Sequence, residues 1–133
     1  MVKSNYYYGD YYLRMGDAAQ AIEYYDKVIE LGEALGDEIN EWKYEAYFHK
    51  GLCEADERKS IEMFKEAEKF FAFIPLEKQN TKAITLYRNI GVCYYKLDMD
   101  EEAIKYFTKA IEGYEKEEKE IGTLVVCYEL RSC

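Results

Sequence analysis

The chain has 133 residues, a length that fits one domain, and apolar residue types make up 49% of it. Its formal net charge of −9 repels phosphate backbones and anionic lipid surfaces, so neither nucleic acid nor a membrane is expected as a partner. One histidine and four cysteines without a C-x-x-C pair predict no metal site and no cofactor, and favour free thiols in a reducing cytoplasm.

Apolar residues recur at helical spacing along nearly the whole chain, and no stretch alternates with the period of two that marks a strand. The first clear stripe is Ala21, Ile22, Tyr25, Val28 and Ile29. The sequence therefore predicts an all-α protein of about seven helices. In chain order, these helices span residues 4–15, 17–35, 38–56, 58–73, 76–97, 100–118 and 120–131.

The breaks between these helices carry recognisable residues. Gly16-Asp17 and Gly36-Asp37 each offer a glycine to end one helix and an aspartate to cap the next. Pro75 lacks an N–H group, so it fits only at a break or in a first helical turn. Such short connections make successive helices antiparallel neighbours.

An internal repeat organises the chain. Gly9, Gly51 and Gly91 lie 42 and 40 residues apart, each inside an odd-numbered helix. A glycine there costs ~1 kcal/mol relative to alanine, so a packing reason is expected. The partner helices carry an aromatic residue at matching positions: Tyr25, Phe64 and Phe107. We therefore expect the two helices of each pair to pack closely at the glycine.

The second repeat departs from the other two. Glu54 stands three residues after Gly51, where the other repeats have Tyr12 and Tyr94. The interval from Gly51 to Ser60 is also three residues shorter than the equivalent interval in the first repeat. Either its inter-helix turn is tighter or its helix is shifted.

This pattern resembles the tetratricopeptide repeat, which combines a small-residue glycine, a following tyrosine and Ala-x-x-x-Phe in the partner helix. The spacing exceeds the usual 34 residues and is similar to the long repeats of kinesin light chains and bacterial quorum-sensing peptide receptors. The resemblance implies a right-handed superhelical stack of antiparallel helix pairs. It also implies a non-enzymatic, peptide- or protein-binding module, as the sensing or adaptor part of a larger bacterial regulator. The alternative is a self-associating structural scaffold.

A single domain is expected over residues 1–133, with repeats at about 5–36, 37–75 and 76–118. The segment 119–133 is then either a capping helix or half of a further repeat. Its apolar residues should pack on the helix at 100–118 and leave one side uncovered, which predicts a weak homodimer through the C-terminal helix. These residues are Ile121, Leu124 and Val125.

A helical wheel places a second set of side chains about 150° from the glycines, where stacked repeats would align them along one groove. They either pack on neighbouring helices or line a groove for a peptide or protein segment. The candidate groove residues are Tyr6, Tyr7, Asp10, Leu13, Arg14, Phe48, His49, Leu52, Arg88, Asn89, Val92, Tyr95 and Lys96. By resemblance, Asn89 would hydrogen-bond the backbone of a bound peptide. No catalytic residue is predicted, because no nucleophile is placed beside His49.

Overall fold

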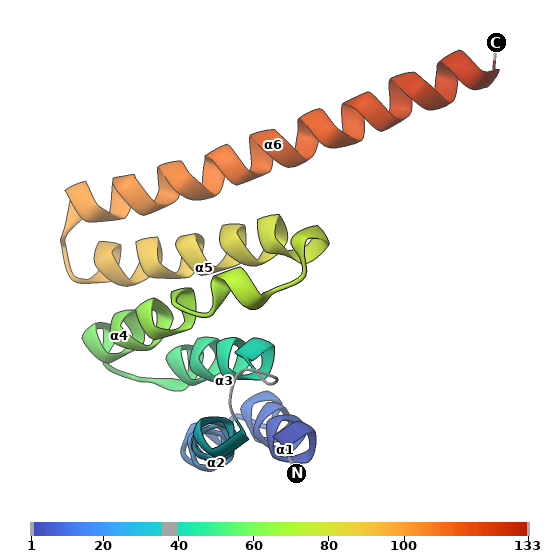
Figure 1. Ribbon diagram of the computed structural model, residues 1–133. Coiled ribbons are helices and arrows are strands. Elements are labelled where there is room, and N and C mark those ends of the chain that lie inside the picture. The colour runs from blue at the N-terminus through green and yellow to red at the C-terminus, as the bar shows by residue number, and fades with distance from the viewer. Residues whose placement is uncertain (1, 36–39, 133) are drawn as a thin grey trace.

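The computed structural model describes residues 2–35 and 40–132, and the side chains of 2–33 and 40–119. This part of the chain contains six α-helices and no strand, which confirms the all-α class (Figure 1). The helices are α1 (Val2–Arg14), α2 (Ala18–Leu35), α3 (Asn40–Cys53), α4 (Glu57–Glu68), α5 (Leu76–Lys96) and α6 (Asp100–Ser132). A short 3-10 helix, Phe71–Phe73, lies between α4 and α5.

The helices form a stack of antiparallel pairs. Each helix contacts the next one along the chain, and α1 also contacts α3. Figure 1 shows α1 and α2 at one end of the stack and α6 at the other. This is the architecture of a tetratricopeptide-like helical solenoid, in which each pair covers the apolar face of its neighbour.

The repeat glycines lie where the sequence predicts close helix packing. A Cβ atom at Gly9 would lie 2.7 Å from the ring of Tyr25, and one at Gly51 would lie 2.7 Å from that of Phe64. At Gly91 the corresponding distance, to the ring of Phe107, is 2.8 Å. Real Cβ contacts are essentially never this short. The packing role of the three glycines is therefore confirmed.

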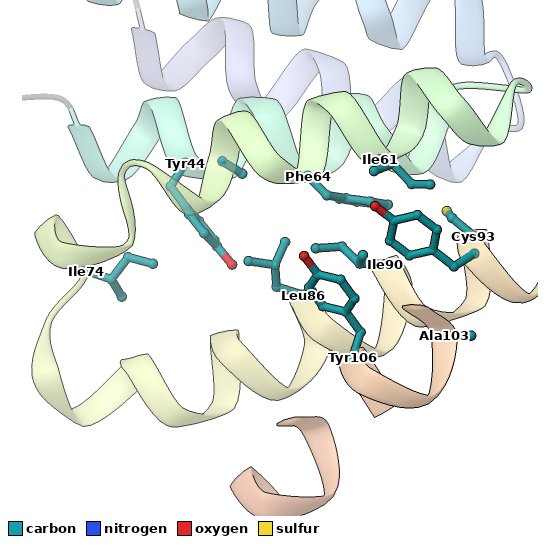
Figure 2. Packing of buried hydrophobic residues seen from close by; sticks show 11 residues of the cluster. Tyr44, Ile61, Phe64, Ile74, Leu86, Ile90, Cys93, Ala103 and Tyr106 are labelled. Atoms are coloured by element: carbon teal, nitrogen blue, oxygen red, sulfur yellow. The ribbon is translucent and has the colours of Figure 1, made fainter. Parts of the chain in front are cut away.

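Among the side chains that the structure describes, the core consists of two clusters, and both join neighbouring repeats. The N-terminal cluster contains Tyr25 and Val28 of α2 with Ala46 and Cys53 of α3. The larger cluster spans α3 to α6 and is drawn in Figure 2. Its buried members are Tyr44, Ile61, Phe64, Ala67, Ile74, Leu86, Ile90, Cys93, Tyr94, Ala103 and Tyr106. Burial between repeats, as well as within them, holds the stack together.

Most helix ends agree with the predicted breaks. Gly16 follows α1 with a φ of +82°, and Asp17 accepts a hydrogen bond from the Gln20 N–H at 3.2 Å. Pro75 directly precedes α5. The predicted break at 36–37 lies outside the described residues.

The irregularity of the second repeat comes from a short helix and not from a tight turn. The connections 15–17, 54–56 and 97–99 are equally long. However, α3 ends two residues after its glycine, whereas α1 and α5 end five residues after theirs. Asp56 then caps α4 by accepting a hydrogen bond from the Arg58 N–H at 2.9 Å. This early end of α3 accounts for the missing three residues.

The prediction of a separate seventh helix at 120–131 was wrong. Residues 100–132 form one helix, α6, so Ile121, Leu124 and Val125 cannot fold back onto residues 100–118. The physical reason lies in residues 115–120, which are all glutamate or lysine. These strong helix formers favour continuation where a break was expected.

Candidate functional site

A hollow of about 220 Å³ lies between the second and third repeats. Four of the predicted groove residues line it, namely Leu52 from α3 and Asn89, Val92 and Lys96 from α5. Leu52 is 42% exposed and Val92 is 37% exposed, so two apolar side chains face solvent at adjoining repeats. The remaining lining residues are Gly51, Glu54, Glu57, Ser60, Phe64 and Cys93.

Asn89 is half-buried at this hollow. Its Nδ2 donates a hydrogen bond to the Thr85 carbonyl oxygen, one turn earlier in α5, at 2.8 Å. A side-chain amide carries two N–H donors and one acceptor oxygen. The bond to Thr85 uses one donor and holds the amide close to its own helix.

The charges around the hollow are of both signs. Lys96 lines it together with Glu54 and Glu57. Sequence reasoning treated Glu54 only as a departure from the repeat and missed its place in the lining. The available signal was its position, because a carboxylate stands where the other repeats have a tyrosine.

Several predicted groove residues are packed among neighbouring rings. The Tyr6 ring lies 5.2 Å from that of Trp42 and 5.5 Å from that of His49. Phe48 lies 5.3 Å from His49, and Leu13 packs against the N-terminal cluster. Tyr6, Leu13 and His49 belong to the contact between α1, α2 and α3, whereas Phe48 packs on Phe64 of α4. None of these four predicted residues lines the hollow.

A half-buried carboxylate connects the three odd-numbered helices. Glu45 of α3 forms an ion pair with Lys82 of α5, and its Oε2 lies 3.6 Å from His49 Nδ1. Burial, together with the charge of Glu45 and a hydrogen bond to it, raises the pKa of Tyr6 in α1. Sequence reasoning missed Glu45, although it precedes His49 by one helical turn. Its interactions thus link α1, α3 and α5.

Of the other five predicted groove residues, four are exposed and Asp10 is half-buried. Asp10 and Arg14 form an ion pair within α1 at 3.0 Å. Tyr7 faces solvent on α1, and Arg88 and Tyr95 face solvent on α5. None of the five lines the hollow.

The two described cysteines show no sign of an activated nucleophile. Cys53 and Cys93 are buried free thiols. Burial raises the pKa of Cys53 to about 11 and also raises that of Cys93, so both stay protonated near neutral pH. In the side chains that the structure describes, no three His, Cys, Asp or Glu residues gather as metal ligands would.

Comparison with known proteins agrees with this architecture. Residues 2–33 and 82–112 each match a model of the tetratricopeptide repeat. Two of the three helix pairs thus carry this repeat. The matched segments fall on α1–α2 and α5–α6 and omit the second pair, whose first helix ends early. A search of the curated proteins found no match.

One solved structure supports the same fold. A crystal structure of MamA protein is 25% identical, with a TM-score of 0.67. The match covers 89% of this chain and 57% of that one, so this chain spans little more than half of its length. A second crystal structure of MamA is 23% identical over 89% of this chain and 81% of its own, with a TM-score of 0.40. Among the described residues, no helix has the length and apolar character needed to cross a bilayer.

Proposed function

We propose that this chain is a non-enzymatic protein-binding module that holds a peptide segment of its partner in the hollow between α3 and α5. The observation that carries this proposal is the convergence of Leu52, Val92, Asn89 and Lys96 from two repeats on one surface hollow. Exposed apolar side chains supply contact area, and an amide can satisfy a peptide group.

Other observations support a more specific form of this proposal. The repeat spacing of 42 and 40 residues supports the long type found in kinesin light chains and quorum-sensing receptors. Such a module would serve as the sensing or adaptor part of a larger regulator. The free, protonated thiols of Cys53 and Cys93 support a cytoplasmic location. Neither nucleic acid nor a membrane surface is proposed as a partner, because the net charge is −9.

Binding can be tested with three pools of labelled random peptides, which are acidic, basic and uncharged. We expect one pool to bind, and Val92→Lys to weaken that binding at least about tenfold by placing a charge in the hollow. The control is Leu76→Lys at the start of α5, where the leucine is 82% exposed outside the hollow. Failure of all three pools to bind, or equal loss in both variants, would refute the proposal.

Asn89→Ala separates a binding role from a structural one. We expect binding of the selected pool to weaken by ~1–3 kcal/mol, because a peptide group would lose its partner. The free energy of unfolding should hardly change, since the bond from Asn89 to Thr85 lies within one helix. Calorimetry and thermal melting on the same variant measure both. Lost stability with retained binding would make Asn89 a structural residue.

A second candidate function is self-association. It is favoured by Ile104 and Ile111 on α6, two large apolar side chains that are more than half exposed. The dimer through the C-terminal helix that the sequence suggested is one form of it. A separate C-terminal helix can no longer be its basis, because α6 is continuous from Asp100 to Ser132.

A further inference from the structure

The outer face of α1 is a stripe of exposed tyrosines. Tyr8 and Tyr11 are each 56% exposed, and Met15 continues the stripe beyond the helix end. The stripe surrounds a surface hollow of about 490 Å³. The residues that line it are Ser4, Tyr7, Tyr8, Tyr11 and Tyr12. Exposed patches of large apolar side chains commonly mark interaction surfaces.

The equivalent faces of α3 and α5 indicate what this face of α1 can contact. In α3 and in α5, three positions contact the even-numbered helix that precedes each of them in the chain. Counted from the repeat glycine, these positions lie five residues before it, one residue before it and two residues after it. In α3 they are Ala46, Lys50 and Cys53, and in α5 they are Leu86, Ile90 and Cys93. Ala46 and Cys53 pack with α2, and Lys50 pairs with Asp26 of α2 at 2.7 Å. The α5 residues pack with Ile61, Phe64 and Ala67 of α4.

The same positions in α1 are Ser4, Tyr8 and Tyr11. All three line the tyrosine hollow, and within the described residues no preceding helix covers them. Among the described residues, therefore, the face of α1 that corresponds to the docking faces of α3 and α5 is exposed.

The outer face of α6 is the matching surface. Ile104 precedes Phe107 by three residues, as Ile61 precedes Phe64 in α4. Ile61 is buried against α5, whereas Ile104 is 65% exposed. Ile111 is also 55% exposed, although its counterpart Ile29 in α2 packs against the N-terminal cluster. Accordingly, α6 exposes the face that corresponds to the one on which α2 and α4 contact the next odd-numbered helix.

Charge favours contact between unlike ends of two molecules. Helix α1 carries two basic residues and one acidic residue. Residues 100–119 of α6 carry seven acidic and four basic residues. Two α6 faces would repel each other, whereas α1 and α6 have opposite net charges.

We propose that α1 of one copy docks on the outer face of α6 of a second copy and continues the stack head to tail. Tyr11 of one copy would contact Ile104 of the other. The equivalent residues inside the chain, Cys93 of α5 and Ile61 of α4, belong to one buried cluster (Figure 2). The contact joins two different faces, so it does not close on itself and builds open chains of copies. This inference rests on the second candidate function and shares no residue with the hollow between α3 and α5.

The test measures the size of the full 133-residue chain by sedimentation at physiological salt and rising concentration. The α1-face variant is Tyr8→Lys with Tyr11→Lys, and the α6-face variant is Ile104→Lys with Ile111→Lys. Unmodified chain and the Leu76→Lys control should form dimers and larger species. Each face variant alone should associate at least about tenfold more weakly. An equimolar mixture of the two should form dimers and nothing larger, since one intact pair of faces remains.

Two other outcomes would contradict the head-to-tail arrangement. If the unmodified chain stays monomeric up to its solubility limit, both head-to-tail stacking and the self-association function fail. If the α1-face variant dimerises while the α6-face variant does not, the contact is symmetric through α6 and the head-to-tail arrangement is wrong. Far-UV circular dichroism checks that the variants fold. The single changes Tyr11→Lys and Ile104→Lys replace any double variant that loses helix content.

Discussion

Single residues set the distance between the two helices of each pair. Gly91 is one such residue, because a Cβ atom there would lie 2.8 Å from the ring of Phe107. Gly91→Leu should lower the free energy of unfolding by ~1–3 kcal/mol or more, since the two helices must move apart. Chemical denaturation measures the loss. The control Val92→Leu, at the next and partly exposed position, should have little effect. An unchanged midpoint for Gly91→Leu would show that the helices do not meet there.

The hydroxyl of Tyr25 gives a second test at this scale. Within the described residues the oxygen is buried without a hydrogen-bond partner, and the equivalent residues are Phe64 and Phe107. Tyr25→Phe should therefore leave the free energy of unfolding unchanged or raise it by up to about 1 kcal/mol. Thermal and chemical unfolding of the variant measure this. A loss of more than about 1 kcal/mol would mean that the hydroxyl is satisfied in the folded protein.

At the scale of elements, the helix ends follow local residue chemistry. The left-handed position after α1 is held by Gly16, but the one after α5 is held by Asp98, with a φ of +60°. Asp98→Gly should raise the free energy of unfolding by up to about 1 kcal/mol, because glycine adopts this conformation without steric cost. The matched control Asp100→Gly, in the first turn of α6, should lower it. Equal effects of the two changes would contradict this account of the α5 end.

The sequence predicted the contacts that depend on spacing. Gly51 and Phe64 meet as expected, because helical periodicity fixes which side of a helix each residue occupies. It could not predict the early end of α3, since Glu54 and Ala55 carry no strong stop signal. Nor could it predict the continuity of α6, where charged helix formers outweigh the expected break.

The candidate site was predictable only in part for a related reason. A wheel gives the direction of a side chain but not how deeply the neighbouring helix covers it. Phe48 and Leu52 were therefore placed together, although Phe48 packs on Phe64 and Leu52 faces the hollow. The tyrosine stripe on α1 was missed because Tyr8 and Tyr11 resemble core residues in a chain with 15 tyrosines.

At the scale of the whole molecule, burial of tyrosines and thiols makes the free energy of unfolding change with pH in alkaline solution. Burial raises the pKa of Tyr87 to about 12, and it also raises the pKa values of Tyr25 and Tyr44. In the unfolded chain such groups ionise near pH 10, and cysteine thiols ionise near pH 8.5. Between the unfolded and folded pKa values, the folded state binds more protons, so the free energy of unfolding falls as pH rises.

We therefore expect full stability from these groups below about pH 8.5 and a progressive loss above it, steeper beyond about pH 10. Denaturation curves at several pH values measure the loss, and tyrosinate absorbance reports the ionisation. Tyr87→Phe should reduce the slope above pH 10. A free energy of unfolding that stays constant to pH 11 would contradict the burial of these groups.

The most direct test of the binding site follows the backbone amide resonances of the labelled protein while the selected peptide pool is added. We predict that the largest shifts fall on residues from both repeats at the hollow, above all Leu52, Asn89, Val92 and Lys96. Amides of the packed Phe48 and His49 should shift less. Shifts confined to α1 and α6, or spread evenly over all helices, would contradict binding between α3 and α5.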